Sequence, residues 1–278
     1  WFKPIERLGY RQEYNVSANA ASEKSSFYLS TAYLDEKGYV KSSDFSRFNG
    51  RANVSVTPRK WIKVGMNLAG SYQESNFTDT DGENAYINPF YYSRFMAPIY
   101  PVYQHDLSSA NGDYILDEAG KKMYDGGSNR GQNPDRHVAW ELEDNMAKSY
   151  RTTLNGQLYS DIKFLKDFTF SLKGDMSLRN SEAQTYNNAS IGDGAGSNGR
   201  ASRTIYRYMN YTFQQQLTWQ RAFGEHNVDV LLGHENYYYH YNYLYNYKTN
   251  QTFPGQTTLS NFSEMTTMTD YYNDVRSE

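Results

Sequence analysis

Apolar and polar residues alternate along several unusually long stretches of the chain. Between Arg47 and Thr57, odd-numbered positions are polar and even-numbered positions are mostly apolar. The same period recurs in residues 62–73, 150–162, 168–179, 209–219 and 228–232, and more weakly in residues 14–21 and 25–34. Strict alternation is typical of β-strands that present two different faces. The pattern predicts eight strands in four antiparallel hairpins.

The lengths of these segments and of their connections favour a transmembrane β-barrel. The predicted strands exceed the ~5–6 residues usual in globular proteins and match the ~9–11 residues of a tilted strand that crosses a bilayer. Links within hairpins are short, at residues 22–24, 58–60, 164–167 and 221–226, whereas links between hairpins are long, at residues 35–44, 75–149 and 180–203. Outer-membrane barrels sort periplasmic turns and extracellular loops in this way.

Charged residues follow the same two-faced pattern. Arg51, Lys63 and Asp175 all fall on the polar side of their segments. A lysine or arginine that faces lipid at mid-depth costs about 2–4 kcal/mol, so this placement is expected if the apolar side meets hydrocarbon. Aromatic residues gather near the short turns and again near the loop ends, where Tyr72 and Tyr208 lie, as in interfacial girdles.

Composition removes several other classes of protein. The chain has 278 residues, a formal net charge of −3, no cysteine and 28 tyrosines. No apolar run approaches the ~20 residues of a membrane-spanning helix, and disulfide or thiolate chemistry is excluded. The balanced charge gives no basic field for nucleic acid, and the aromatic content argues against disorder. The alternative to the barrel is a soluble or surface-attached β-rich module that binds glycans.

Both ends suggest an internal piece of a longer protein. The chain opens at Trp1 without an initiator methionine or a signal peptide, and it closes at Glu278 on a polar stretch. We therefore expect that the barrel continues beyond this sequence.

Several motifs near the start resemble one family. They are Gln-Glu-Tyr-Asn-Val-Ser at 12–17, Ser-Glu-Lys-Ser-Ser-Phe-Tyr-Leu-Ser at 22–30, Tyr-Leu-Asp-Glu-Lys-Gly-Tyr-Val at 33–40 and Trp-Ile-Lys-Val-Gly at 61–65. The sequence resembles the SusC/RagA-type TonB-dependent outer-membrane transporters of Bacteroidetes. The later parts of the chain are compatible with this family but less specific.

The resemblance implies a large barrel in the outer membrane, in contact with its lipid, whose lumen holds a plug. It also implies import of a bulky nutrient, an oligosaccharide or a peptide, with energy from the TonB complex and a SusD-like surface lipoprotein as partner. On this basis residues 1–74 hold two hairpins, 75–149 an extracellular loop, 150–249 two further hairpins and 250–278 a loop. Neither the plug nor the ends of the barrel are expected here, and no enzyme activity or cofactor is implied.

The long loop contains a predicted short helix. Asn88 is a good N-cap, Pro89 suits the first helical position, and Pro98 lies beyond the expected end. Phe90, Tyr92 and Arg94 would then offer two rings and a cation to a ligand or to the partner lipoprotein. The alternative is that these aromatic residues pack the loop against itself or against the barrel rim.

A run of alternating tyrosines forms a second candidate site. Tyr239, Tyr241 and Tyr243 begin a series on one face of a strand that continues through Tyr247. Their flat rings could stack on sugars. The alternative is an aromatic girdle that continues above the membrane.

Three further motifs resemble metal-binding or phosphate-binding sites but are incomplete. His234-Glu235 begins like a zinc-binding helix, but Tyr238 occupies the position of the second histidine. The glycine-rich segment 192–196 lacks a phosphate-binding strand and helix, and predicts a flexible loop. Residues 79–84 contain only part of a calcium loop. No metal site is predicted.

Overall fold

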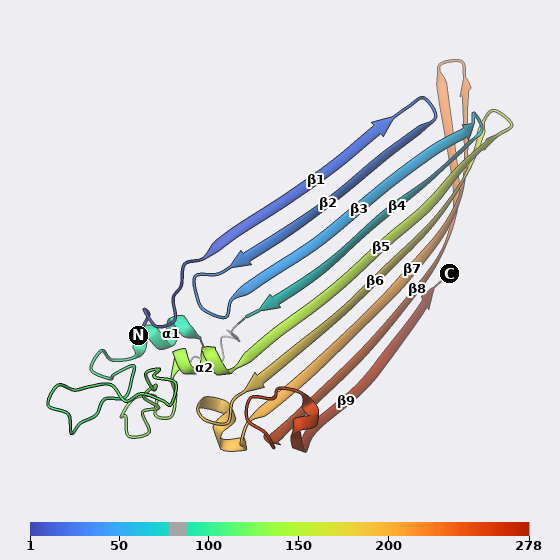
Figure 1. Cartoon of the computed structure of the whole chain (residues 1–278). Coiled ribbons are helices and arrows are strands. Elements are labelled where there is room, and N and C mark those ends of the chain that lie inside the picture. The colour runs from blue at the N-terminus through green and yellow to red at the C-terminus, as the bar shows by residue number, and fades with distance from the viewer. Residues whose placement is uncertain (78–87, 278) are drawn as a thin grey trace.

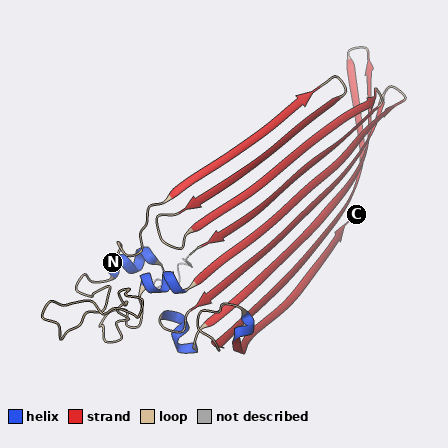
Figure 2. Cartoon of the chain, viewed as in Figure 1, coloured by secondary structure: helices blue, strands red, loops and turns tan. Residues whose placement is uncertain are grey.

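Nine antiparallel strands form one sheet in chain order (Figures 1 and 2). The computed structural model describes residues 1–77 and 88–277. The strands are β1 (Tyr10–Ala21), β2 (Ser25–Lys37), β3 (Asp44–Arg59), β4 (Ile62–Asn76), β5 (Met146–Phe164), β6 (Phe168–Asn187), β7 (Arg200–Phe223), β8 (His226–Gln251) and β9 (Phe262–Ser277). The first eight confirm the four predicted hairpins, and the all-β, antiparallel fold class is confirmed.

The ninth strand corrects the prediction for residues 250–278. That segment was expected to be a loop, but only its first part is one, including the short 3₁₀-helix η2 (Leu259–Asn261). β9 then pairs with β8, so that Tyr271 lies opposite Tyr243 and Asp274 opposite His240. The sequence pattern did not predict β9 because polar residues occupy both of its faces.

The two ends of the sheet differ in their connections. The short turns lie together at one end and the long loops at the other (Figure 1). Helices α1 (Pro89–Phe95) and α2 (Val138–Asp144) belong to the connection between β4 and β5, and the 3₁₀-helix η1 (Gly192–Ser197) connects β6 to β7. β6 and β7 are longer than predicted, which shortens the connection expected at residues 180–203. None of the helices in the described residues is long and apolar enough to cross a membrane.

Strand register divides the sheet into two faces. Val54, Met66, Leu158 and Phe213 lie in one row of what we call the apolar face, with Gly174 between the last two. The adjacent row, on the polar face, contains the following residues: Asn53, Asn67, Gln157, Asp175 and Thr212. The predicted separation of charged from apolar residues is therefore present in three dimensions.

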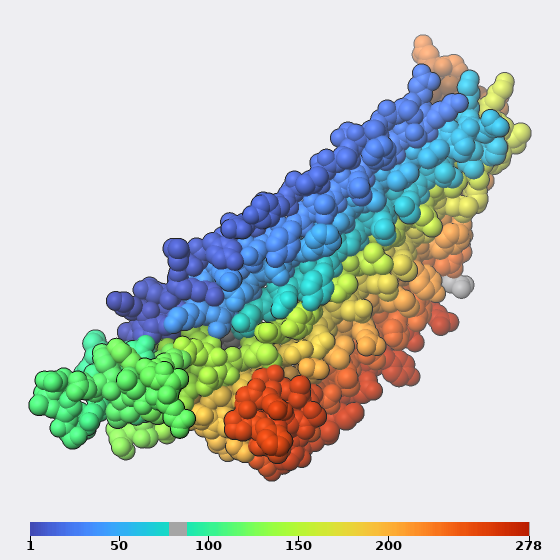
Figure 3. Space-filling view, viewed as in Figure 1, coloured from blue at the N-terminus to red at the C-terminus, as the bar shows by residue number. Residues whose placement is uncertain are grey.

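In the described part of the chain the sheet is a single layer over most of its length, and Figure 3 shows one of its faces uncovered. Leu158 is 63% exposed and Leu232 is 71% exposed. Val54, Met66 and Phe213, which would be buried together in a soluble sandwich, are each exposed as well. Monomeric soluble proteins rarely leave so large an apolar surface in water.

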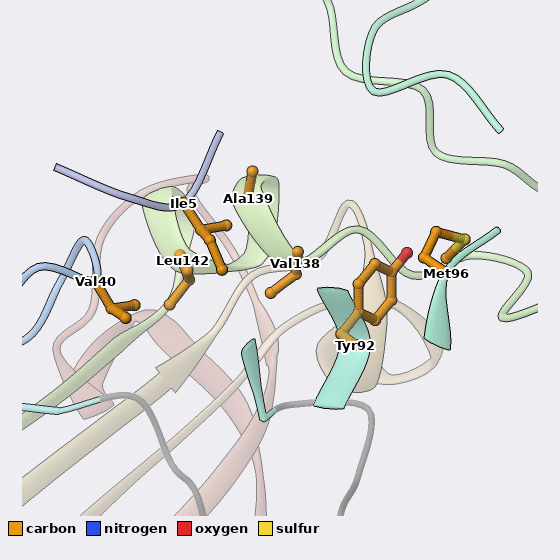
Figure 4. Packing of buried hydrophobic residues seen from close by; sticks show 7 residues of the cluster. All are labelled: Ile5, Val40, Tyr92, Met96, Val138, Ala139 and Leu142. Carbon is orange, nitrogen blue, oxygen red and sulfur yellow. The ribbon is translucent and has the colours of Figure 1, made fainter. Parts of the chain in front are cut away.

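The buried core lies instead at the long-loop end. Ile5 and Val40 from the first part of the chain pack with residues of α1, α2 and the segment after α1 (Figure 4). The whole cluster consists of Ile5, Val40, Tyr92, Met96, Val138, Ala139 and Leu142. Residues 88–145 of the connection between β4 and β5 therefore form a packed structure that rests on the end of the sheet.

Candidate ligand-binding surface

The odd-numbered tyrosines of β8, from Tyr237 to Tyr247, face the polar side of the sheet. Tyr241 lies opposite Tyr208 and Tyr243 opposite Tyr206, and the corresponding ring centroids are 4.8 and 5.1 Å apart. Tyr239 is 6.4 Å from Tyr208, and Tyr271 of β9 is 6.0 Å from Tyr241. We call these six residues the tyrosine cluster: Tyr206, Tyr208, Tyr239, Tyr241, Tyr243 and Tyr271.

This placement contradicts the idea that the run is a lipid-facing girdle. Val228, Val230 and Leu232 occupy even positions of β8 and face the apolar side, whereas Tyr239, Tyr241 and Tyr243 occupy odd positions. Tyr208 was also assigned to a girdle from the sequence, and register places it on the polar face. The sequence does contain a signal for this placement. The apolar residues at the start of β8 stand at even positions, so residues at odd positions along the same strand are expected on the polar face.

A cation extends the tyrosine cluster toward β6. The guanidinium carbon of Arg179 lies 4.2 Å from the ring centroid of Tyr208, and the two residues are opposite each other in register. This distance is well within the range of a cation–π contact. Neither residue was among the predicted site residues.

The series of odd-numbered tyrosines in β8 ends at a cavity beneath α2. Tyr245 and Tyr247 continue the face of the cluster and line a cavity of about 410 Å³. Glu141 of α2 and Arg200 of β7 also line it, together with Thr185 and other polar residues of the strand ends. The polar face thus leads from half-buried rings to a partly open cavity that is lined by an acidic and a basic side chain.

Four charged residues fasten the two large loops to each other beside this cavity. Arg136 pairs with Glu141 at 3.1 Å and with Asp193 of η1, and Arg200 pairs with Asp193 at 3.3 Å. Burial raises the pKa of Glu141 to about 7, although the nearby Arg136 opposes this change. Glu141 therefore titrates close to neutral pH.

His137 caps the N-terminus of α2 as a neutral side chain. Its Nδ1 accepts a hydrogen bond from the backbone N–H of Trp140 at 3.2 Å, so its Nε2 donates to the carbonyl of Val102 at 2.8 Å. Burial lowers the pKa of His137 to about 4. The ring positions α2 over the cavity.

Helix α1 begins as predicted but does not gather its three candidate residues. The Asn88 side chain accepts hydrogen bonds from the N–H groups of Phe90 and Tyr91 at 3.0 and 3.2 Å. Tyr92 is fully buried, its hydroxyl donates to the carbonyl of Arg136 at 2.7 Å, and burial raises its pKa to about 12. Tyr92 therefore cannot contact a ligand, and for this residue the packing alternative is correct.

The other two candidates of α1 remain on the surface. Phe90 packs beside Phe2 and Tyr39, at centroid distances of 6.1 and 6.0 Å, and is 38% exposed. Arg94 is exposed in the last turn of α1. Their use by a ligand or a partner stays a prediction, and they are separate from the tyrosine cluster.

The remaining motifs add no second site. His234 lies in β8, where its Nδ1 is 2.7 Å from Oε1 of Gln215. Within residues 1–77 and 88–277, no group of three or more histidines and acidic residues could hold a metal ion. The glycine-rich segment forms η1, which corrects the expectation of a flexible loop. Residues 79–84 lie outside the described residues.

Comparison with curated sequences identifies similar proteins. No family model matches the chain. TonB-dependent receptor P3 of Formosa agariphila is 25% identical over 240 residues, which cover 84% of this chain and 22% of that protein. TonB-dependent receptor P26 of the same organism is 26% identical over 243 residues, which cover 84% of this chain and 21% of the relative. The chain spans about a fifth of the length of these relatives. They are receptors by name, which agrees with the prediction that the chain is not an enzyme.

Solved structures share the fold. The chain matches the RagAB peptide transporter with a TM-score of 0.71 and 17% identity, over 99% of this chain and 30% of that one. It matches the open-open state of the RagAB peptide importer with a TM-score of 0.73 and 18% identity, over 99% of this chain and 29% of that one. The chain is a β-barrel segment, and its resemblance to RagA-type TonB-dependent receptors is confirmed by sequence and by fold.

Proposed function

We propose that this chain forms part of the wall and the outer loops of a TonB-energised transporter in the outer membrane. The observation that carries the proposal is the uncovered apolar face of a sheet whose opposite face is polar. Burial of apolar area is favourable by roughly 25 cal/mol per Å², so the face that includes Leu158 and Phe213 requires an apolar environment. Acyl chains supply it without a second protein layer.

The polar face supports the same proposal because its side chains satisfy one another in a wet environment. Asn67 donates to Gln157 at 2.8 Å, and Gln157 donates to Asp175 at 2.7 Å. Ser71 and Thr153 form a further hydrogen bond at 2.6 Å. Cross-strand ladders of this kind suit the interior of a barrel that holds water or a plug.

The relatives support a proposal for the cargo and the partners. The matched receptors carry TonB in their names, and the matched structures are described as a peptide transporter. By analogy, this protein would import a bulky nutrient, an oligosaccharide or a peptide, together with a SusD-like lipoprotein and the TonB complex. The tyrosine cluster, Phe90 and Arg94 are the residues we propose for contact with cargo or partner.

A soluble glycan-binding module is the alternative. It requires a layer that buries Val54, Met66 and Phe213, and the described residues contain none over these positions. The structure therefore favours the membrane assignment over the soluble one.

The proposal is tested with the full-length protein in its native host. We expect it to fractionate with the outer membrane and to need detergent to remain monodisperse. Uptake of its nutrient should stop when TonB is deleted and resume when TonB is restored. A full-length protein that is monodisperse in plain buffer, or uptake that does not depend on TonB, would refute the proposal.

A further inference from the structure

Four arginines share one region of the polar face toward the long-loop end. Arg47 and Arg151 lie in the register row of Tyr206 and Tyr243, and Arg179 lies in the next row with Tyr208. The following row contains Arg51. From β3 to β9 these three rows contain no acidic residue. A chain with net charge −3 thus has a purely cationic and aromatic zone, which we call the arginine–tyrosine zone.

The four arginines are not neutralised by the protein around them. None has a carboxylate within 4.0 Å among the described residues, whereas Arg136, Arg200 and Arg203 are all ion-paired. The Nε of Arg47 is buried and makes no hydrogen bond in the described part of the chain. A buried guanidinium donor without an acceptor is costly, so an anion that reached this zone would gain both charge pairing and hydrogen bonds.

The floor between the arginines is shallow, and Asp175 is the acidic residue among those that line it. Two grooves of about 490 and 380 Å³ both reach Arg51. Asn155 lines both of them, Ser177 and Asn210 line the first, and Ser71 and Thr153 line the second. These side chains are shorter than the arginines, and their amides and hydroxyls can both donate and accept hydrogen bonds.

We infer that the arginine–tyrosine zone binds an acidic oligosaccharide, one that carries uronate carboxylates or sulfate groups. This inference rests on the proposed import function and names the class of its cargo. Guanidinium groups bind oxyanions through paired hydrogen bonds, and half-buried tyrosine rings supply flat apolar surface with a polar edge. The amides and hydroxyls of the floor suit sugar hydroxyls.

An acidic peptide fits this zone less well. A peptide brings an ammonium terminus, and a carboxylate balances its charge best. The three rows offer none, and Asp175, which lines the first groove, already accepts a hydrogen bond from Gln157 at 2.7 Å. Carbohydrate rings carry no cation and therefore match the zone throughout.

The inference is tested by calorimetric titration of the purified full-length protein with four probes. The probes are tetragalacturonate, its neutral methyl ester, a sulfated carrageenan tetrasaccharide and tetraglutamate. We expect an acidic tetrasaccharide to bind and the neutral ester to bind at least tenfold more weakly. Higher salt should weaken only the acidic ligand. Whether carboxylate or sulfate is preferred distinguishes the two anionic groups.

Variants place the binding on the polar face. Arg151→Gln and Arg179→Gln should each weaken the acidic probe about tenfold. Arg207→Gln is the matched control, because Arg207 is exposed next to Tyr206 and Tyr208 but projects from the opposite face of β7. It should leave the affinity unchanged. Heat-modifiable migration on gels confirms that each variant has folded.

Each other outcome overturns the inference. Equal binding of the neutral ester, equal effects of all three substitutions, or no binding of either acidic sugar would refute it. If tetraglutamate is the only probe whose binding depends on Arg151 and Arg179, the zone binds acidic peptides rather than sugars. If these variants bind the sugars normally but another part of the same protein becomes easier to cleave by protease, the arginine–tyrosine zone instead contacts that part of the protein. In every one of these cases TonB-dependent uptake can persist, so the proposed function is tested separately.

Discussion

Tyr208 of β7 and Tyr241 of β8 lie opposite each other on the polar face, with their ring centroids 4.8 Å apart. The same strands carry Tyr211 and Tyr238 on the apolar face, at 4.9 Å. Two similar ring pairs therefore lie on opposite sides of one sheet. Register alone places the first pair on the polar face, which we propose lines the interior of the barrel.

The two ring pairs predict different effects on uptake. Tyr208→Ala removes a ring that contacts Tyr241 and Arg179, and aromatic contacts are each worth about 0.5–1.5 kcal/mol. We expect nutrient affinity to fall roughly threefold to tenfold. Tyr211→Ala, on the other face, should leave affinity unchanged. Equal losses in transport assays of the two variants would show that the polar-face rings have no special role.

A charge on the apolar face should prevent assembly in the membrane. Phe213→Arg places a guanidinium among apolar residues, at a cost of about 2–4 kcal/mol if the position is near mid-depth in lipid. Thr212→Arg, one residue earlier, places the same charge on the polar face and should be tolerated. The folded fraction in bilayers, measured by heat-modifiable migration, should fall only for Phe213→Arg.

Tyr92 should stabilise the packed loop rather than bind a ligand. Tyr92→Ala empties the centre of the cluster in Figure 4 and should cost about 3–5 kcal/mol locally, whereas Tyr92→Phe loses one hydrogen bond and about 1 kcal/mol. Proteolysis within residues 88–145 should accelerate strongly for Tyr92→Ala. Phe90→Ala is the surface control. A loop that resists proteolysis in Tyr92→Ala would contradict this assignment.

The packed loop should respond to pH through two opposing groups. The pKa of Glu141 is raised to about 7, so its contribution to stability is complete below the ordinary glutamate pKa and is lost as the pH rises through 7. The pKa of His137 is lowered to about 4, so its contribution is complete above its ordinary value near 6.5 and is lost as the pH falls toward 4. Each effect is on the order of 3 kcal/mol.

Single substitutions should separate the two effects. Glu141→Gln leaves the histidine, so the loop should open more as the pH falls from 6.5 to 4. His137→Asn leaves the glutamate, so the loop should open more as the pH rises from 4.5 to 7. Hydrogen–deuterium exchange of residues 88–145, corrected for intrinsic rates, measures both slopes. Slopes of the same sign in the two variants would contradict the account.

The sequence pattern predicted most of the sheet because two-faced strands leave a period of two in the chain. β3 to β7 keep mostly apolar residues on one face, with exceptions such as Ser160 and Gln215, so their hairpins were evident. β9 was missed because Asp270, Asp274 and Arg276 occupy the side of Tyr238 and Leu244, where the apolar pattern of β8 has already ended. A strand that is polar on both faces has no hydropathy period to detect.

The candidate site was only partly predictable for a related reason. Tyr239, Tyr241 and Tyr243 were found as a series, but their face depends on the parity of the whole strand and on the partners that β7 supplies. Arg179 and Tyr208 come together only through register. Tyr92 was misassigned because a seven-residue helix does not reveal which side packs on distant residues such as Val138.

The most direct test of the whole account is a spin-label scan of β7 in the full-length protein, embedded in lipid bilayers. Single labels at residues 209–219 report collision rates with oxygen, which dissolves in lipid, and with a water-soluble nickel chelate. The account predicts that odd positions such as Phe213 favour oxygen and even positions such as Thr212 favour nickel. The opposite alternation, or no alternation, would contradict it.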